Sequence, residues 1–191
     1  MPDALIARSA LRAHVAPETK PAGAARATLR ERQNLVLASV AALKGREDEL
    51  AAAVREHFGL DLLAGPTQVA SGAVSFVGAG PGKWLLVSSD PSLDPSGLPA
   101  AVVDQSDGRT VLSLSGEAAP EILATLVQID LHPGAFGAGS AAATHAAGIS
   151  VQLWRSDDAP TYELAVFRSY AATLWRWLVH AGASRGLDAK L

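Results

Sequence analysis

The sequence predicts an α+β fold with mostly antiparallel sheets and about three helices, organised as two similar halves rich in β-α-β order. Three observations predict this class. Short apolar runs with branched residues recur along the chain, short turn-like connections join many of them, and only three segments show a helical period. A doubly wound parallel sheet fits less well, because parallel strands need long crossover connections.

Length and composition allow one generous core or two smaller cores that share a face. The chain has 191 residues, of which 49% are hydrophobic and 18% charged, within the ordinary globular range. Much of the apolar content is alanine, which buries little area per residue. The large side chains must therefore supply much of any core or interface.

Residues 1–30 are predicted to form an N-terminal arm. This segment mixes Pro2, Pro17 and Pro21 with small residues and shows no sustained period. Two interpretations stay open: a frayed tail, or an arm that becomes ordered against a partner.

The first half, residues 31–98, is expected to contain one helix. Residues 45–59 begin with an acidic turn, carry an apolar stripe at Leu50, Val54 and Phe58, and end at a C′ glycine, Gly59. The other elements expected in this half are a strand at 34–43, a hairpin of strands at 72–78 and 83–88, and a Pro/Ser-rich loop at 91–97.

The second half, residues 99–191, is expected to resemble the first in the order of its elements. Its helix is predicted at 119–128, with Ser115 as the N-cap and Pro120 tolerated in the first turn. The other elements expected here are strands at 100–106, 110–115, 139–145, 149–154 and 161–167, and a closing helix at 169–182.

Charge and cysteine content exclude several classes of function. The net charge is −3 without any cluster of Lys and Arg, so no nucleic-acid partner is expected. The absence of cysteine removes disulfides, thiolate metal sites and cysteine nucleophiles. No apolar run is long enough for a membrane span, so we expect a soluble, cytoplasmic protein.

The loop at 134–145, "GAFGAGSAAATH", looks like a phosphate site but lacks the chemistry of one. It leads into an alternating run rather than a helix, and no lysine lies between Lys83 and Lys190. Ser140 and Ser106 have no nucleophile-elbow motif around them. His132 and His145 are interpreted as structural, and the five histidines show no metal-ligand spacing. We therefore assign no catalytic, cofactor-binding or metal residue to this chain.

Several short motifs appear in a characteristic order. They are Gly80-Pro-Gly-Lys-Trp-Leu-Leu-Val-Ser88, the Asp-x-Ser-x-Gly-Arg run at 104–109, Asp130-Leu-His-Pro133, Thr144-His145, Leu153-Trp-Arg155 and Arg168-Ser-Tyr170. In this order and spacing, the segment 104–178 resembles the gamma subunit of heterotetrameric sarcosine oxidase. Together the motifs cover about the last three-fifths of the chain.

The resemblance implies a small subunit with a fold similar to the folate-binding aminomethyltransferase proteins. Its partners would be the alpha, beta and delta subunits of a complex that oxidatively demethylates sarcosine to glycine. The one-carbon product would be formaldehyde or methylene-tetrahydrofolate, and oxygen would become hydrogen peroxide. FAD, FMN, NAD and tetrahydrofolate would belong to the alpha and beta subunits and zinc to delta, which leaves gamma without a catalytic role.

A stand-alone folate-binding one-carbon transfer protein is the alternative. Folate proteins of this fold carry an acidic Gly-Gly-x-x-Asp-Asp type turn, but the corresponding stretch at 147–151, "AGISV", has no carboxylate. A hydroxyl or alkyl group cannot replace that carboxylate in holding the pteridine nitrogens. The Asp157-Asp158 pair is interpreted as a solvated hairpin turn.

The closing helix offers a candidate subunit interface. Residues two apart on a helix point about 200° apart, so Trp175 and Trp177 cannot both face one core. The stripe Phe167, Tyr170, Leu174, Trp177 and Ala181 is predicted to face inward, which leaves Trp175 outside. We expect interface residues at Trp175, Trp154, Arg155 and Trp84, and expect Trp175→Asp to weaken assembly more than folding. The alternative is that this chain covers both faces of the helix.

Overall fold

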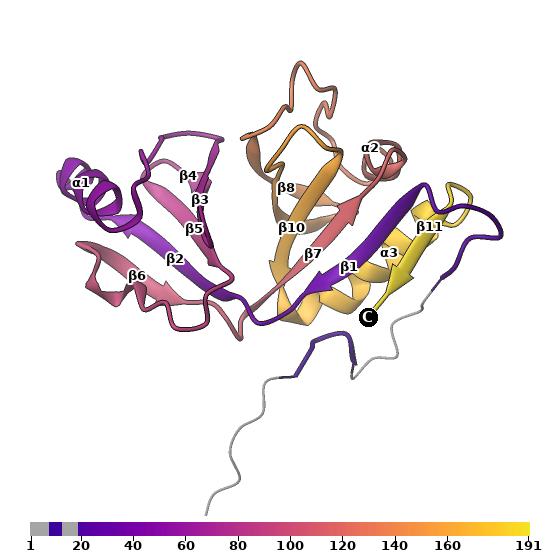
Figure 1. Ribbon diagram of the computed structural model, residues 1–191, viewed down its shortest axis with the longest axis horizontal. Coiled ribbons are helices and arrows are strands. Elements are labelled where there is room, and N and C mark those ends of the chain that lie inside the picture. The colour runs from indigo at the N-terminus through magenta and orange to yellow at the C-terminus, as the bar shows by residue number, and fades with distance from the viewer. Residues whose placement is uncertain (1–7, 13–18) are drawn as a thin grey trace, which may run out of the picture.

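The computed structural model describes residues 8–12 and 19–191 and has four layers (Figure 1). Two sheets pack face to face, with one helix outside the first sheet and two helices outside the second. The cluster between the sheets contains Leu37, Val77, Leu85, Val87, Val111, Ala141, Trp154 and Ala165. The predicted α+β class is therefore confirmed. None of the helices in the described ranges is long and apolar enough to span a membrane.

The first sheet is antiparallel throughout and is covered by α1 (Glu47–Phe58). Its strand order is β3 (Gln68–Ser71), β4 (Val74–Gly80), β5 (Lys83–Ser88), β2 (Val36–Ala42) and β6 (Ala100–Asp104). Leu50 and Val54 of α1 are fully buried against its outer face, as the apolar stripe predicts. Gly59 ends the helix in the left-handed region at φ 64°, where glycine is free of strain.

The second sheet has six strands and carries α2 (Ala119–Leu123) and α3 (Ala171–Gly182) on its outer face. Its order is β11 (Leu187–Lys190), β1 (Ala27–Arg32), β7 (Arg109–Ser115), β10 (Thr161–Phe167), β9 (Ile149–Trp154) and β8 (Ala141–Ala146). Only the β1–β11 pair is parallel among the described strands. Two short 3₁₀ turns, η2 (Pro95–Gly97) and η3 (Arg168–Tyr170), also lie in the described part of the chain.

The two sheets repeat one topology. The order β3-β4-β5-β2-β6 in the first sheet corresponds to β8-β9-β10-β7-β1 in the second. In each half, a helix follows the strand that lies fourth in this order, α1 after β2 and α2 after β7. β1 and β6 are exchanged between the two sheets. β1 comes before β2 in the chain but lies in the second sheet, whereas β6 comes before β7 but lies in the first sheet. β11 has no counterpart in the first sheet among the described residues.

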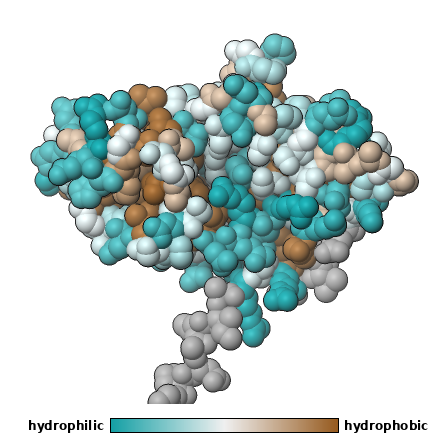
Figure 2. Space-filling model, viewed as in Figure 1, coloured by the Kyte–Doolittle hydropathy of each residue, from teal (hydrophilic) through white to brown (hydrophobic). Residues whose placement is uncertain are grey.

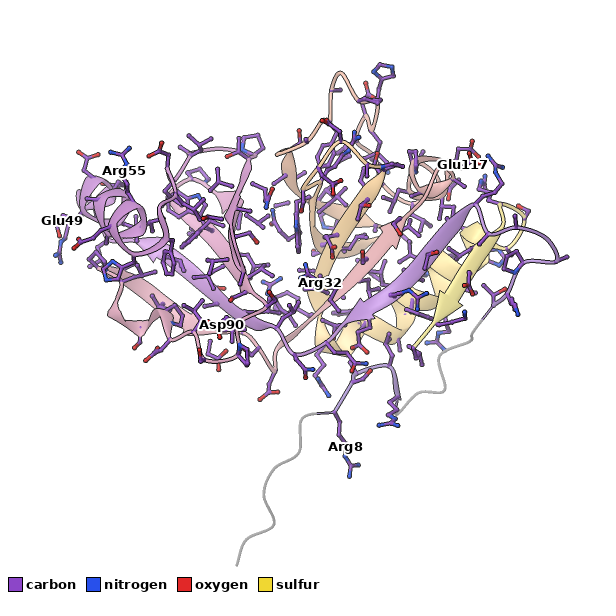
Figure 3. The ribbon with its side chains drawn as sticks, in the orientation of Figure 1. Arg8, Arg32, Glu49, Arg55, Asp90 and Glu117 are labelled. Atoms are coloured by element: carbon purple, nitrogen blue, oxygen red, sulfur yellow. The ribbon has the colours of Figure 1, made fainter. Side chains whose placement is uncertain are left out.

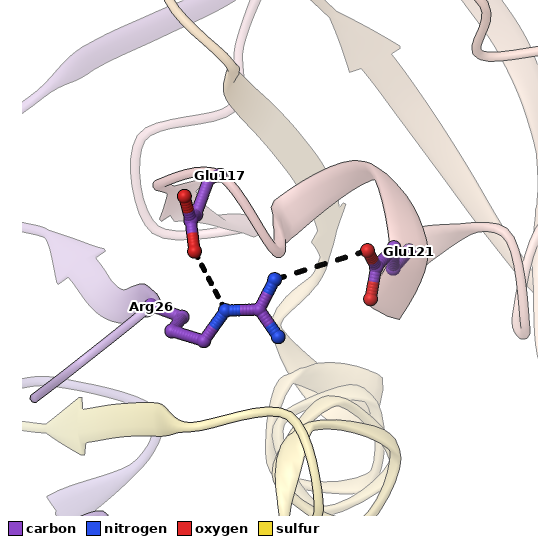
Figure 4. A network of polar contacts seen from close by, with 3 residues as sticks. All are labelled: Arg26, Glu117 and Glu121. Atoms are coloured by element: carbon purple, nitrogen blue, oxygen red, sulfur yellow. Dashed lines mark hydrogen bonds and ion pairs between the residues drawn. The ribbon is translucent and has the colours of Figure 1, made fainter. Parts of the chain in front are cut away.

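The predicted N-terminal arm of residues 1–30 ends earlier than expected, because residues 27–30 lie in β1, the second strand of the six-stranded sheet, while residues 1–7 and 13–18 lie outside the described residues. Arg26, just before β1, binds Glu117 at 2.6 Å and lies 4.0 Å from Glu121 (Figure 4). The Arg26 carbonyl accepts from Ala118, and a Cβ at Gly116 would lie 2.5 Å from it, so glycine is required there. β1 was missed because only Ala27 and Leu29 face the core, too few to show a period.

Three further differences concern short elements. β3 and β11 were not predicted, because each has four residues and few apolar ones. α2 ends at Leu123 rather than at 128, and its N-cap is Ala118 rather than Ser115, which lies in β7. The division into 1–30, 31–98 and 99–191 stays a prediction about folding units. In the structure, β1 pairs with β7 of the second half, and β6 pairs with β2 of the first half.

Candidate functional site

The glycine-rich loop before β8 joins the two halves of the molecule. The Gly139 N–H donates to the Arg155 carbonyl at 2.8 Å, and the Gly139 carbonyl accepts from Gln68 at 2.7 Å. The Ala141 N–H donates to the Pro66 carbonyl at 2.9 Å. The last two bonds cross the seam between β8 and β3, and the first stays within the second half. All of these groups are thus engaged, whereas a phosphate cradle needs free N–H groups that converge on an anion.

The candidate nucleophiles and bases have local structural contacts. Ser106 Oγ accepts from the Leu37 N–H at 3.0 Å, which ties the end of β6 to β2. His132 Nδ1 accepts from the Gly134 N–H at 3.1 Å. His145 Nε2 lies 3.2 Å from Ser150 Oγ on the neighbouring strand, in an exposed cross-strand pair. Among the described residues no three His, Asp or Glu side chains are placed to share a metal ion.

The stretch that would carry the folate carboxylate is a tight turn between β8 and β9. Ala147 and Gly148 both have positive φ, 49° and 79°, as in the two-residue turns that match the twist of a hairpin. Ile149 and Val151, which follow, point into the core of the second half. The turn and the residues after it, 147–151, therefore carry no carboxylate.

Arg155 is a buried clamp rather than a surface residue. It is 5% exposed, and its guanidinium donates to the carbonyls of Asp157, Asp158 and Ala159 at 3.0, 2.6 and 3.3 Å. A fourth bond, of 3.2 Å, reaches the carbonyl of Phe136. Arg155 thereby fixes the β9–β10 turn, where Asp157-Asp158 lies exposed as predicted, and ties it to the glycine-rich loop.

Glu163 of β10 is a buried carboxylate. Its side chain is 9% exposed and lies 3.8 Å from Arg32. Burial raises the pKa of Glu163, and the charge of Arg32 only partly opposes this shift. One of its oxygens, Oε2, has no hydrogen-bond partner among the described residues.

We expect Glu163→Gln to stabilise the protein at neutral pH and to have little effect at acid pH. A carboxyl with a raised folded-state pKa holds its proton more tightly in the folded state, so stability is lost as pH rises above the ordinary glutamate pKa of about 4.3. Urea unfolding of both proteins between pH 4 and pH 7 measures this. Equal pH slopes for the two proteins would show that Glu163 does not contribute.

A polar cavity of about 190 Å³ lies where the chain crosses between the halves. Two of its arginines contact neighbours within the chain: Arg109 stacks over Phe167 at 4.4 Å, and Arg168 donates to the Arg8 carbonyl. The Arg8 side chain itself points away from the body of the molecule (Figure 3). The cavity thus lies between the segment at 8–12 and the crossover, and one buried nitrogen at it, Nε of Arg109, has no hydrogen-bond partner among the described residues.

Comparison with known proteins assigns the family. Residues 44–184 match the family described as "Sarcosine oxidase, gamma subunit family". This chain is a member of the sarcosine oxidase gamma subunit family. It is 34% identical to the sarcosine oxidase subunit gamma of Arthrobacter sp, over 80% of this chain and 78% of that protein. It is 29% identical to the subunit gamma of Corynebacterium sp. (strain U-96), over 84% and 81%.

Solved structures agree with the gamma-subunit family. One chain of the heterotetrameric sarcosine oxidase from Corynebacterium sp. U-96, in complex with pyrrole 2-carboxylate, superposes with a TM-score of 0.78. The match covers 97% of this chain and 98% of that chain, at 29% identity. Aminomethyltransferase T of the glycine cleavage system from Bartonella henselae gives 0.60 at 17% identity, over 94% of this chain and 50% of that one. The second match concerns the fold alone and confirms the predicted aminomethyltransferase-like fold.

The family motifs carry structural roles in this gamma-family chain. Trp154 is 1% exposed and fills the core between the two sheets. Trp84 is 7% exposed and donates its indole N–H to the Leu63 carbonyl at 3.0 Å. With Arg155 and Trp175 also buried, all four predicted interface residues are at most 7% exposed in this chain.

The predicted face of the closing helix is wrong. Trp175 is fully buried, with Ala171, Leu174 and Leu178, whereas Trp177 is 45% exposed. Leu174 belongs to two apolar stripes of helical spacing, the predicted one with Trp177 and the observed one with Ala171 and Leu178. The helical period alone therefore does not show which stripe is buried. The polar neighbours were the usable signal, because Thr173, Arg176 and His180 lie on the side of Trp177 at about 100° per residue.

Proposed function

We propose that this chain is the non-catalytic gamma subunit of a heterotetrameric sarcosine oxidase. The observation that carries the proposal is the similarity, over nearly its whole length, to one chain of such an enzyme. The complex would demethylate sarcosine to glycine, yielding formaldehyde or methylene-tetrahydrofolate and hydrogen peroxide. Its alpha and beta subunits would hold FAD, FMN, NAD and tetrahydrofolate, and its delta subunit zinc.

The chain itself would contribute a docking surface for a large flavin-bearing subunit. We call this the aromatic surface: Phe167, Tyr170, Trp177 and His180, at the end of β10 and along α3. The three large rings are 45%, 53% and 45% exposed, and Trp177 packs edge-on against His180 at 6.4 Å between ring centres. Exposed aromatic clusters of this kind are enriched in protein interfaces.

The positive charge around the aromatic surface indicates what kind of partner surface would bind there. Residues 164–187 contain three arginines and no carboxylate, although the chain as a whole carries −3. Arg168 and Arg176 lie in this segment, next to the exposed rings. A partner face that presents carboxylates around an apolar centre would complement this surface in charge and in shape.

We expect Trp177→Asp to leave the fold intact and to remove the chain from the complex. An exposed substitution changes stability little, whereas loss of a central aromatic in an interface costs about 2 kcal/mol or more, roughly 30-fold in affinity. The measurement is affinity purification from cells that co-express the neighbouring subunits, followed by native mass spectrometry. Leu63→Asp, at a 49% exposed residue outside the surface, is the matched control. Equal recovery of both variants in the complex would exclude this surface.

The same purification tests the function. A flavin-coloured heterotetramer that oxidises sarcosine supports the proposal. The aminomethyltransferase-like fold favours one alternative, a stand-alone folate-binding one-carbon transfer protein, although its turn at 147–148 lacks the acid. A colourless monomer that binds tetrahydrofolate in a titration would replace the proposal by that alternative.

A further inference from the structure

The first sheet ends at β6 without the strand that the internal repeat would place beside it. β6 corresponds to β1, and the outer edge of β1 is covered by β11, in parallel. Nothing in the described ranges pairs with the outer edge of β6. We propose that β6 accepts an extended segment of a partner subunit as a sixth, parallel strand. This inference rests on the proposed function, because it needs a partner subunit.

The backbone of β6 has free groups at the required spacing. The Gln105 N–H donates inward to the Leu37 carbonyl at 2.7 Å, and Val103 faces Ser39 in the same register. Because backbone groups alternate along a strand, those of Val102 and Asp104 point away from β2. Main-chain bonds to such an edge supply affinity when an extended segment adds to a sheet.

β6 lacks the usual protection of an edge strand. Its residues are Ala100, Ala101, Val102, Val103 and Asp104, so charge occurs only at its end. Val103 is 55% exposed. β11 carries Asp188 and Lys190, and charged side chains are a common device that prevents pairing of an edge. Hydrophobic residues gather over the half that contains α1 and β6 (Figure 2).

A cavity beside β6 provides space for apolar side chains of the incoming strand. Its volume is about 470 Å³, and Val36, Leu93 and Val102 form part of its apolar wall. Asp94 and Asp104 lie at the same cavity. A strand next to β6 would place alternate side chains on the side of this wall.

The charges around β6 specify a basic segment. Residues 84–108 contain four aspartates and no lysine or arginine. Hydrogen bonds from Ser92, Ser96 and Ser106 lower the pKa of Asp90, Asp94 and Asp104 respectively, so these carboxylates stay charged at neutral pH. The occupant is therefore an extended segment with alternating apolar residues and flanking Lys or Arg. A second copy of this chain fits poorly, since two-fold symmetry pairs identical edges in antiparallel fashion.

Hydrogen exchange with single-residue resolution tests the inference on the isolated chain and on the purified complex. We expect the amides of Val102 and Asp104 to exchange fast in the isolated chain and at least about tenfold more slowly in the complex. The amides of Val103 and Gln105 are bonded to β2 and should be slow in both. Fast exchange at Val102 and Asp104 within an active complex would overturn the strand addition and leave the subunit function standing.

Two proline variants supply an independent readout. Val102→Pro removes an outward N–H and should shift the unfolding temperature by less than about 5 °C while reducing recovery in the complex about tenfold or more. Val103→Pro removes an N–H bonded to β2 and should destabilise the isolated chain, which checks the register. Full recovery of Val102→Pro in the complex would contradict the proposal, as would protection of Val102 in a homodimer without partners. Absence of any complex in the wild type would instead remove the proposed function.

Discussion

Trp175→Asp is expected to unfold the chain, not to produce a folded subunit that fails to assemble. Trp175 is fully buried between α3 and the second sheet. Removing a buried tryptophan costs about 3–5 kcal/mol, and an uncompensated carboxylate in its place adds several more. Because domains of this size are stable by about 5–15 kcal/mol, little or no folded protein should remain.

Circular dichroism and the soluble yield of the isolated chain measure this effect. Trp175→Phe keeps an aromatic ring in the site and should retain a cooperative, though lower, unfolding transition. Trp177→Asp, two residues away, should melt close to the wild type. A native melting curve for Trp175→Asp would mean that α3 packs on the second sheet through the face that carries Trp177, as the apolar stripe in the sequence predicts.

Arg155→Met is expected to lower the free energy of unfolding by about 3–5 kcal/mol, an effect second to that of Trp175→Asp. Methionine has a similar length but no donors, so four carbonyl groups lose their shared partner in the β9–β10 turn and the glycine-rich loop. Arg155→Lys keeps the charge but lacks the planar fork that reaches carbonyls in two segments at once. Its loss should therefore be intermediate.

Denaturant unfolding of the three proteins gives the free energies, and limited proteolysis locates the change. New cleavage should appear at residues 133–140 and 156–160, the two segments that Arg155 joins. Asp158→Asn, in the exposed turn, is the matched control, because the bond uses its backbone carbonyl and not its side chain. A loss below about 1 kcal/mol for Arg155→Met would show that solvent replaces the guanidinium.

Much of the local structure was predictable from the chain. α1 and α3 lie within the predicted ranges, and all eight predicted strands occur, because their apolar residues alternate or repeat over enough positions to show a period. The family was recognisable from short motifs. In the structure, Trp154 of one motif fills the core between the sheets, and Arg155 of the same motif clamps two loops. These motif residues therefore have packing roles.

The sequence by itself determined the α+β class, the helices α1 and α3, the turn at Ala147-Gly148 and the lack of an acid there. These properties depend on residues near one another in the chain. The tertiary structure decided the exchange of β1 and β6 between sheets, the burial of Trp175 instead of Trp177, and the open edge at Val102. Each of these depends on which surfaces meet across the fold, and spacing along one segment carries no information about its distant neighbours.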